Sequence, residues 1–502
     1  MWSDRLSEAK KRRLTERLHA ILPAPDPHGR GAVTPLRLPG SRSTATVEQM
    51  AEELRHEPGF AWLDGGPAGS HRFFVRPLVT LTVRNGRATV NGSIGRIAFA
   101  AGGFDLLEAA FAAWGGPARA LLVGFLGYEL AAELETLEPA SPVDLEDDLK
   151  LPDLHLALYD EALCHDGHHD GGGWRLESTD AWHSWGRARG DAERVRDAEA
   201  RLAAARKREV PEPETGRLAA SPVTGRPNAR GFLAAVERTV SRIRRGQIYQ
   251  ANLCRRLEAK LPADRLWPLW QRLRAASPAD RAAWLSLSGR ADRDGAVLSV
   301  SPELFLSVRA GTVTTQPIKG TRPRGATPRE DRALARELAE SAKDQAELAM
   351  IVDVARNDLG RVCTTGSVEV VHHAELMTLP TLHHTASTIR GQLRPEAGSV
   401  SLLRAAFPPA SITGAPKIQA IIVAASEEER RRGPAMGAFG WLSLGGDLEL
   451  SVAIRTAAAA GGRIVYHAGC GITADSDPEQ ELEESAVKAR AFLTALGAAE
   501  SP

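Results

Sequence analysis

Cysteine is scarce in this sequence. The 502 residues include only Cys164, Cys254, Cys363 and Cys470, and these lie too far apart to form the paired motifs of a zinc site. The scarcity also argues against a small scaffold held by disulfides. It is typical of a protein from a reducing compartment, so we expect a cytoplasmic location.

Neither sign of charge is in excess, and no long apolar run is present. Lys+Arg and Asp+Glu both number 63, so the formal net charge is zero. We therefore expect no nucleic acid or membrane surface to be held by bulk charge. Without 18 consecutive uncharged apolar residues, no membrane span is expected. Residues 1–24 mix Lys and Arg with Leu and Ile, so we also expect no secretory leader.

The length and the hydrophobic content of 43% are typical of a globular protein with a large core. Three regions differ in pattern. We expect a strand-rich N-terminal subdomain over residues 1–185, a helical and proline-rich linker over 186–227, and a catalytic subdomain over 228–495.

Local patterns predict both helices and strands. Asn85-Gly86 between two extended runs, 79–83 and 88–90, is a hairpin signal. Phe232, Val236, Val240 and Ile243 recur at helical spacing. Further predicted elements are helices at 105–114, 191–208, 343–355 and 481–496, and strands at 73–75, 120–126, 154–159, 297–300, 304–308 and 464–467. The periodicities alone predict a mixed α and β fold.

Lys319 stands between a proline turn and a glycine, in residues 316–325 (QPIKGTRPRG). The preceding run, 312–315, reads as a strand, so we expect the amine at a sharp strand exit. A lysine on rigid backbone that is kept partly dry can lose its proton and act as a nucleophile. On this segment alone, a surface lysine in a basic turn is the simpler interpretation.

Two acidic pairs share one spacing. Asp344 and Glu347 stand three residues apart on one predicted helix, and Glu481 and Glu484 do so on another. Each pair would lie on one helical face. If the two faces met, the carboxylates would need a cation, and Mg²⁺ suits a site shared with an anionic substrate. The alternative is two solvated acidic faces.

Other residues could bind or protonate a substrate. Glu303 follows a proline between two apolar runs, where it is either a general acid with a raised pKa or an edge-strand charge. Residues 412–417 offer backbone N–H groups, and Gly469 and Gly471 allow close backbone approach to a carboxylate. Arg455 and Lys488 supply positive charge, although a lone arginine is more often a salt-bridge residue at the surface.

Five segments, in this order, resemble the chorismate-utilising enzymes. They are residues 246–253 (GQIYQANL), 316–325 (QPIKGTRPRG), 346–361 (AELAMIVDVARNDLGR), 407–417 (FPPASITGAPK) and 469–479 (GCGITADSDPE). The resemblance is strong over residues 228–495 and weak before them. It implies an α+β fold in which two large antiparallel β-sheets pack together, with helices outside.

The resemblance also implies roles for the reactive residues. Lysine at position 319 resembles component I of aminodeoxychorismate synthase, whereas the closely similar anthranilate synthases usually carry alanine there. It implies that Lys319 is the nucleophile and that Glu303 exchanges a proton near the departing hydroxyl. The implied direct Mg²⁺ ligands are Glu347 and Glu484, with Asp344 and Glu481 acting through water or as helpers.

The resemblance further implies the substrate contacts. Arg455 and the glycine turn would face the enolpyruvyl carboxylate of chorismate, and His384 would lie near the leaving hydroxyl. The full implied set of substrate-binding residues is Gln250, Thr321, His384, Thr413, Gly414, Arg455, Gly469, Gly471 and Lys488.

Gln250 bears on the choice of nucleophile. Where water adds first, the resemblance places a lysine base at this position, and glutamine cannot serve as one. The implied reaction therefore joins chorismate and ammonia to form 4-amino-4-deoxychorismate. Because the sequence has no Gly-x-Cys-x-Gly segment and little room for a glutaminase, the implied source of ammonia is a separate glutamine amidotransferase in a heterodimer.

Two other functions stay open. One is anthranilate synthase component I, which also releases pyruvate. The other is a catalytically silent scaffold for an amidotransferase, and the retained acids and Lys319 argue against it.

Two segments depart from the resemblance. Pro409-Ala410 replaces two usual glycines, which leaves that loop's conformation open, and residues 62–65 only loosely resemble a segment that cradles tryptophan. Tryptophan binding is therefore a hypothesis.

Overall fold

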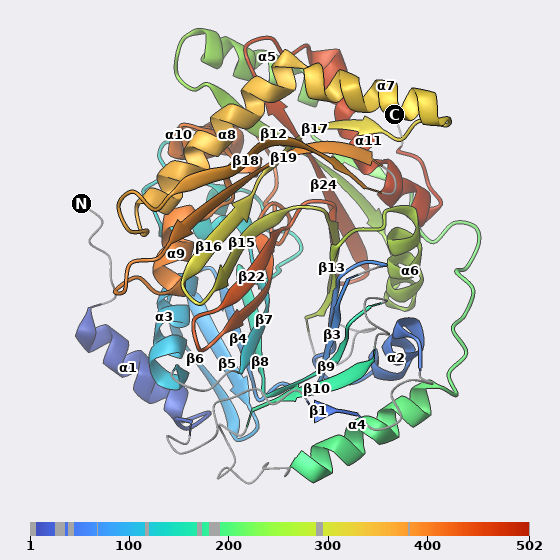
Figure 1. Cartoon of the computed structure of the whole chain (residues 1–502). Coiled ribbons are helices and arrows are strands. Elements are labelled where there is room, and N and C mark those ends of the chain that lie inside the picture. The colour runs from blue at the N-terminus through green and yellow to red at the C-terminus, as the bar shows by residue number, and fades with distance from the viewer. Residues whose placement is uncertain are drawn as a thin grey trace.

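Two large antiparallel sheets form the centre of the molecule, and the described residues give each of them twelve strands. The computed structural model describes residues 7–25, 36–38, 45–67, 69–115, 120–167, 173–179, 191–287, 295–379 and 382–500. Figure 1 shows one sheet at the right and the other at the left, spreading apart toward the bottom of the view. This arrangement confirms the expected α+β fold of two packed sheets with helices outside.

The first sheet contains the glycine-rich strand β24. Its order is β1 (Leu36–Arg37), β10 (Trp174–Ser178), β9 (Glu161–His165), β3 (His71–Phe74), β2 (Ala61–Asp64), β13 (Arg281–Ser286), β14 (Ala296–Ser301), β23 (Thr456–Ala460), β24 (Arg463–Ile472), β12 (Gln250–Lys260) and β11 (Thr224–Arg226), with β20 (Gly414–Ala415) on β12.

The second sheet contains the strand of Lys319. Its order is β17 (Ile318–Pro323), β19 (Leu382–Gln392), β16 (Thr312–Gln316), β15 (Leu304–Arg309), β22 (Leu448–Val452), β21 (Ala438–Ser443), β7 (Leu121–Leu126), β8 (Leu154–Tyr159), β4 (Val79–Arg84), β5 (Arg87–Gly92) and β6 (Gly95–Ala100), with β18 (Glu369–Thr378) on β19.

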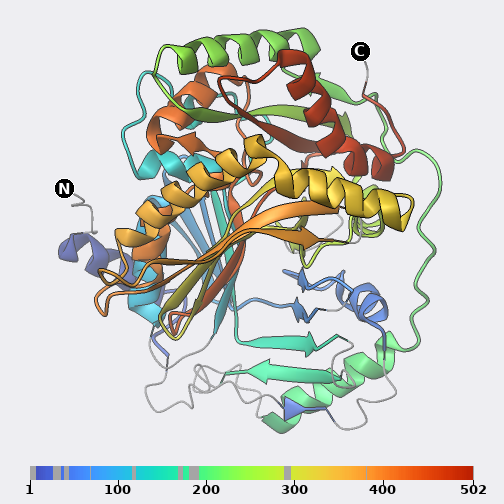
Figure 2. The same ribbon diagram turned by 45° about the horizontal axis from the view of Figure 1, so that its top comes forward.

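Each sheet mixes early and late strands. In the first sheet β2 pairs with β13, and in the second β7 pairs with β21, both antiparallel. The regions 1–185 and 228–495 therefore contribute to both sheets and share their cores. Between them, the charged helix predicted at 191–208 is present, and the chain then rises along the outside of the molecule to β11 (Figure 2).

Helices cover the outer faces of both sheets (Figures 1 and 2). They are α1 (Glu8–His19), α2 (Val47–Leu54), α3 (Gly103–Trp114), α4 (Asp191–Ala205), α5 (Ala229–Arg244), α6 (Leu266–Ala276), α7 (Pro328–Glu340), α8 (Ala342–Gly360), α9 (Ser399–Ala406), α10 (Lys417–Glu427) and α11 (Pro478–Leu496), with short 3₁₀ turns η1 (Tyr128–Glu133), η2 (Pro142–Asp144), η3 (Ala263–Arg265) and η4 (Ala410–Ile412).

A buried apolar layer lies between the sheets. Phe125 and Phe439 from the second sheet and Leu285, Val297 and Val465 from the first belong to one cluster. Two larger clusters lie beneath the outer helices, one for each sheet. Because the central strands pack apolar side chains on both faces, they are almost continuously buried.

Local sequence signals account for the ends of the elements that position the site. Ser341 accepts a hydrogen bond from the Asp344 N–H and so caps α8. Asp477 caps α11 in the same way through the Gln480 N–H, and Gly497 ends that helix in the left-handed conformation. Asn85 and Gly86 both have positive φ, which confirms the predicted hairpin.

In the part of the chain that the structure describes, no helix has the length and apolar character of a membrane span.

Candidate active site

Lys319 reaches across from the second sheet to the first. An added Cβ on Gly471 of β24 would lie 3.5 Å from the Lys319 Nζ atom and 2.4 Å from the Gln250 Nε2 atom. Gln250 begins β12, the neighbour of β24. The amine, the glutamine and the glycine turn, which are far apart in the sequence, therefore meet in one place.

The segment around Lys319 differs from the expectation in one respect. The sharp strand exit is wrong: Lys319 is the second residue of β17, and β16 and β17 both pair with β19. Pro317 separates the two strands without ending the pairing, because its carbonyl still accepts a hydrogen bond from the Ser387 N–H. A register shift between Lys319 and Thr321 follows at Gly320, whose φ is +66°.

The Lys319 amine is held by backbone. Its Nζ atom donates a hydrogen bond of 3.1 Å to the carbonyl of Ser411, in η4. No carboxylate in the described ranges lies within ion-pair distance of this nitrogen. In the described chain, main-chain contact and not an ion pair therefore positions the amine.

Glu303 lies deep in the protein between β14 and β15. It is 3% exposed, and burial raises the pKa of its carboxyl to about 7, although the Ser411 hydroxyl and the charge of Lys319 oppose part of this rise. The Ile318 N–H donates to its Oε1 atom at 3.4 Å. A carboxyl that titrates near neutrality can both give and take a proton, and the role of Glu303 as a general acid stays a prediction.

The two acidic pairs face the same region from α8 and α11. Burial raises the pKa of Glu347, and the negative charges of Glu484 and Asp344 raise it further. Lys343, at the start of α8, acts in the opposite direction on Glu347, Glu481 and Glu484. The two helices therefore bring the acids within electrostatic reach of one another.

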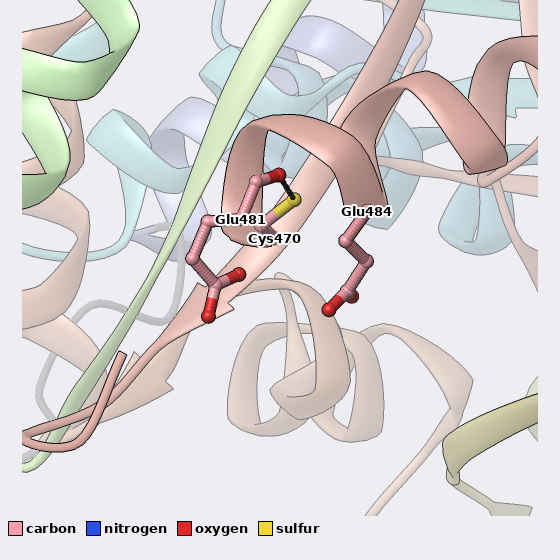
Figure 3. Close-up of side chains that lie close together, drawn as sticks. All are labelled: Cys470, Glu481 and Glu484. Carbon is pink, nitrogen blue, oxygen red and sulfur yellow. Dashed lines mark hydrogen bonds between the residues drawn. The ribbon is translucent and has the colours of Figure 1, made fainter. Parts of the chain in front are cut away.

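Figure 3 shows how the α11 pair is arranged around Cys470. One ligand atom from each of Cys470, Glu481 and Glu484 lies within 4.8 Å of the others. The thiol donates to the Glu481 main-chain carbonyl at 3.2 Å, and burial raises its pKa, so it is a poor metal ligand. Both carboxylates project away from the sulfur in the same direction.

The acidic cluster fits a hard divalent cation. The Ser476 hydroxyl donates to the Glu481 Oε1 atom at 2.7 Å, whereas Oε2 is buried without a partner among the described residues. Oxygen ligands and excess negative charge are the donor set that Mg²⁺ prefers. Arg322 approaches Asp344 at 3.4 Å, so Asp344 is partly neutralised while Glu347 has no ion pair in the described chain.

His384 and Thr321 face each other across β19 and β17. His384 Nδ1 lies 3.0 Å from the Gly320 carbonyl, which can only accept, so Nδ1 carries the proton. Thr321 Oγ1 lies 3.1 Å from the same nitrogen. Burial lowers the pKa of His384 to about 4, so the ring is neutral, and its Nε2 lone pair has no partner in the described part of the chain.

Arg455 contributes an unpaired positive charge. It connects β22 to β23 with φ +52°, a left-handed conformation that non-glycine residues seldom adopt. Across the ranges described above, its guanidinium forms no ion pair, yet its charge is near enough to lower the pKa of His384. An unpaired cation in a site is suited to a substrate carboxylate.

Two substrate-binding candidates have their polar groups engaged inside the protein. Lys488 Nζ lies 2.6 Å from Glu484 Oε1 and 2.9 Å from the Gly469 carbonyl, so it joins the acids to β24. The Thr413 hydroxyl donates to the carbonyls of Pro409 and Ala410, and so it supports its own loop. Their contacts with a substrate stay predictions.

The glycines of the site allow close approach of strands. An added Cβ on Gly414, which has φ +141°, would lie 2.1 Å from the Gln250 main-chain oxygen. On Gly469 it would lie 2.6 Å from Asn252 Nδ2. At Gly414 the contact is with the main chain of β12, so a side chain there would displace the strand, whereas at Gly469 the Asn252 side chain would have to move.

Sequence reasoning missed three residues of the site. Ser411 receives the Lys319 hydrogen bond, Lys343 faces three of the acids, and Arg322 approaches Asp344. Ser411 and Arg322 lie in the motif segments, and Lys343 directly precedes Asp344. The sequence shows the charge of these residues or their place in a motif, but it does not show which side chains or main-chain groups they contact.

The sequence profile described as chorismate binding enzyme matches residues 59–494, most of the chain. The chain belongs to this family. The family and its fold agree with the resemblance carried by the five segments.

Relatives of this chorismate-binding enzyme carry two different names. The chain is 36% identical to aminodeoxychorismate synthase component 1 of Salmonella typhimurium, over 74% of this chain and 76% of that protein. It is also 36% identical to anthranilate synthase component 1 of Arthrobacter globiformis, over 92% and 82%. It is 39% identical to aminodeoxychorismate synthase of Streptomyces griseus over 75% of the chain, but spans only about half of that protein.

A solved structure also resembles this chorismate-binding enzyme. It is anthranilate synthase component I from Streptococcus pneumoniae, with a TM-score of 0.70, 27% identity, and coverage of 85% of this chain and 92% of that one. The departure at Pro409-Ala410 is accommodated in this fold, because Pro409 has φ −53° and directly precedes η4.

The N-terminal segment that loosely resembles a tryptophan cradle packs against its own chain. Trp62 stacks on Phe73 and lies beneath the Arg274 guanidinium, 4.2 Å from it. Asp64 is buried, 3.0 Å from His71 Nδ1 and 2.5 Å from Arg274 Nε. Tryptophan binding by this chorismate-binding enzyme stays a prediction. A calorimetric titration with tryptophan that gave no heat and no thermal shift would exclude it.

Proposed function

We propose that the chain is the aminating component of an aminodeoxychorismate synthase. It would convert chorismate and ammonia to 4-amino-4-deoxychorismate and water, with the enolpyruvyl group retained. The product would serve p-aminobenzoate and folate synthesis or other aminated metabolites. The observation that carries the proposal is the position of the Lys319 amine beside Gly471 and Gln250.

The residue at position 319 supports amination at C4 over anthranilate formation. After losing its proton, Lys319 would attack C2 of the ring while the C4 hydroxyl leaves with a proton from Glu303. Ammonia would then add at C4 and expel the lysine. Each bond broken is matched by one formed, and the nitrogen of ammonia ends at C4.

Mg²⁺ is proposed as the cofactor. Glu347 and Glu484 would hold it directly, and Asp344 and Glu481 would support the site. When bound, the ion supplies electron withdrawal through the ring carboxylate. Independently, Arg455 would bind the enolpyruvyl carboxylate, and the His384 Nε2 lone pair would accept a hydrogen bond from the C4 hydroxyl.

Two features support ammonia rather than water as the second nucleophile. Gln250 cannot act as a base, and its Oε1 atom is buried without a partner in the described residues, so it can accept an N–H from ammonia. We propose that a separate glutamine amidotransferase supplies this ammonia. The partner would release it close to the site and away from water.

The main rival is anthranilate synthase component I, because some relatives carry that name. Purified chain, chorismate, Mg²⁺ and ammonium should yield 4-amino-4-deoxychorismate by mass spectrometry. Pyruvate, followed with lactate dehydrogenase and NADH, should stay at background. Stoichiometric pyruvate with anthranilate would replace the proposal by the rival, and no product at all would favour the silent scaffold.

A further inference from the structure

A groove opens on the outside of the protein, separated from the candidate active site by α8 and the chain after α9. Its volume is about 580 Å³, and the second half of α8, the chain after α9 and the start of α10 line it. Tyr249 at its edge is 71% exposed. We call it the outer groove, and its lining includes Tyr249, Met350, Asn357, Arg404, Phe407 and Ile418.

A smaller inner cavity lies on the other side of the same elements. Glu303, Pro317 and Ser411 line it, and most of its remaining lining is apolar. Asp358 lines both spaces. The inner cavity therefore ends at the proposed proton donor and at the residue whose carbonyl holds the Lys319 amine.

The partition between the two spaces is one layer of chain. Along residues 405–410, Phe407 and Pro408 face the outer groove, whereas Ala406 and Pro409 face the inner cavity. On α8 the same division holds, with Asn357 toward the groove and Ala355 toward the cavity. The same two stretches of chain therefore line both spaces from opposite sides.

An ion pair occupies the centre of the partition. Lys417 Nζ lies 2.6 Å from Asp358 Oδ2 and donates to the Ala406 carbonyl at 2.8 Å. Asp358 is 4% exposed, so its charge and that of Lys417 compensate each other away from water. A small neutral molecule crosses such a buried region at a lower desolvation cost than an ion.

Ser411 places a hydroxyl inside the inner cavity, next to the carboxyl of Glu303. The residue is more than nine-tenths buried, and its hydroxyl lowers the pKa of the Glu303 carboxyl. A hydroxyl oxygen can also accept a hydrogen bond from a small molecule. Its place beside Glu303 suits a small molecule with N–H groups and a lone pair.

The outer groove is distant from the acids that would hold the substrate. Asp358 follows Glu347 by eleven residues on α8, which is about 16 Å along the helix axis. We propose that ammonia enters through the outer groove, passes the Asp358–Lys417 partition and reaches Lys319 through the inner cavity, while chorismate arrives from the side of the acids. The proposal rests on ammonia being the nitrogen donor.

Filling the inner cavity tests the route. Ala355→Met would place extra volume between the groove and Glu303 without altering a charged or hydrogen-bonding group. We expect the KM for ammonium to rise at least about fivefold, while the KM for chorismate changes less than about twofold. Ala349→Met is the matched control, because Ala349 is on the same helix, is exposed and lines neither space.

A second variant avoids the buried position. Asn357→Trp would cover the outer groove from its exposed wall, so a normal melting temperature is expected together with a raised KM for ammonium. Rates with ammonium chloride are measured from pH 7 to 9. Because the neutral molecule is the one that passes, the KM for total ammonium should fall as pH rises in both variants and in the unaltered chain.

The outcomes separate the two proposals. If the unaltered chain forms no aminated product, the proposed function fails before the route is tested. If it forms product and both folded variants keep the ammonium KM of the Ala349→Met control, ammonia takes another path and the route is wrong. A rise in the chorismate KM alone would assign the groove to chorismate instead.

Discussion

The amine of Lys319 is anchored to the carbonyl of Ser411 at 3.1 Å, so a side chain of the second sheet is aimed by a loop that leads into the first. Backbone holds this nitrogen, since no carboxylate of the described chain pairs with it. Such an anchor fixes the direction in which the amine points.

Replacing Lys319 by alanine tests the nucleophile. We expect formation of 4-amino-4-deoxychorismate to fall by about a hundredfold or more, or the product to shift toward anthranilate. The fold should be intact, because the side chain makes one hydrogen bond and its strand pairs through backbone. Product identity by mass spectrometry is the measurement, with Lys260→Ala, at the exposed end of β12, as the control. Unchanged product and rate would refute the role.

The acidic cluster is tested by Glu347→Gln, which keeps the shape and removes the charge. We expect activity to fall more than about a hundredfold. Mutating a residue that only hydrogen-bonds to a metal ligand already lowers metal affinity or activity by about 10- to 100-fold. Excess Mg²⁺ should not restore it. Calorimetric titration with Mg²⁺ gives a second readout. Equal affinity in this variant and in Glu340→Gln, an exposed control on α7, would exclude Glu347 as a ligand.

Proton donation by Glu303 predicts a pH-dependent rate. Its pKa is raised to about 7 by burial, so the carboxyl loses its proton as pH rises through neutrality. The turnover number at saturating chorismate and ammonia should then decrease above that pH. Glu303→Gln should be almost inactive at every pH. A rate that is flat from pH 6 to 9 in the unaltered chain would contradict donation by this group.

The same raised pKa predicts a contribution to stability. The ordinary value is 4.5 and the folded value about 7, so the folded state retains a proton that the unfolded chain has lost. The stabilisation is complete below the ordinary pKa and disappears as pH rises through the folded one, a change of about 3 kcal/mol. Urea unfolding at pH 5 and 8 should show this dependence, and in Glu303→Gln it should be smaller by that amount.

Gly471→Ala tests the close approach of the two sheets. The new Cβ would lie 2.4 Å from Gln250 Nε2, so this amide would have to shift, whereas its distance of 3.5 Å from Lys319 Nζ is ordinary van der Waals contact. We expect the KM for chorismate to rise about tenfold or more, because a misplacement of about 1 Å is costly. Gly360→Ala is the control, since its Cβ would meet nothing within 4 Å. Identical kinetics in both variants would place the substrate elsewhere.

Local elements were predictable where one strong signal dominated. The hairpin at Asn85-Gly86, the strand β8 and the helices α8 and α11 follow from turn residues, apolar runs and helical spacing. The predicted strand exit at Lys319 was wrong because a proline at that point usually ends pairing. Here β19 runs past Pro317 and pairs with β16 and β17 in turn.

The chemical character of this protein was determined by its sequence: a lysine between proline and glycine, two acidic pairs at helical spacing, and glycines where a side chain would collide. Tertiary structure alone decided that Lys319 of β17 meets Gly471 of β24 and Gln250 of β12, and that Asp358 separates an outer groove from an inner cavity. The reason is physical. Spacing along the chain specifies which residues share one face of a helix or strand. Contacts between residues of the two sheets depend instead on strand order and packing, which no local pattern encodes.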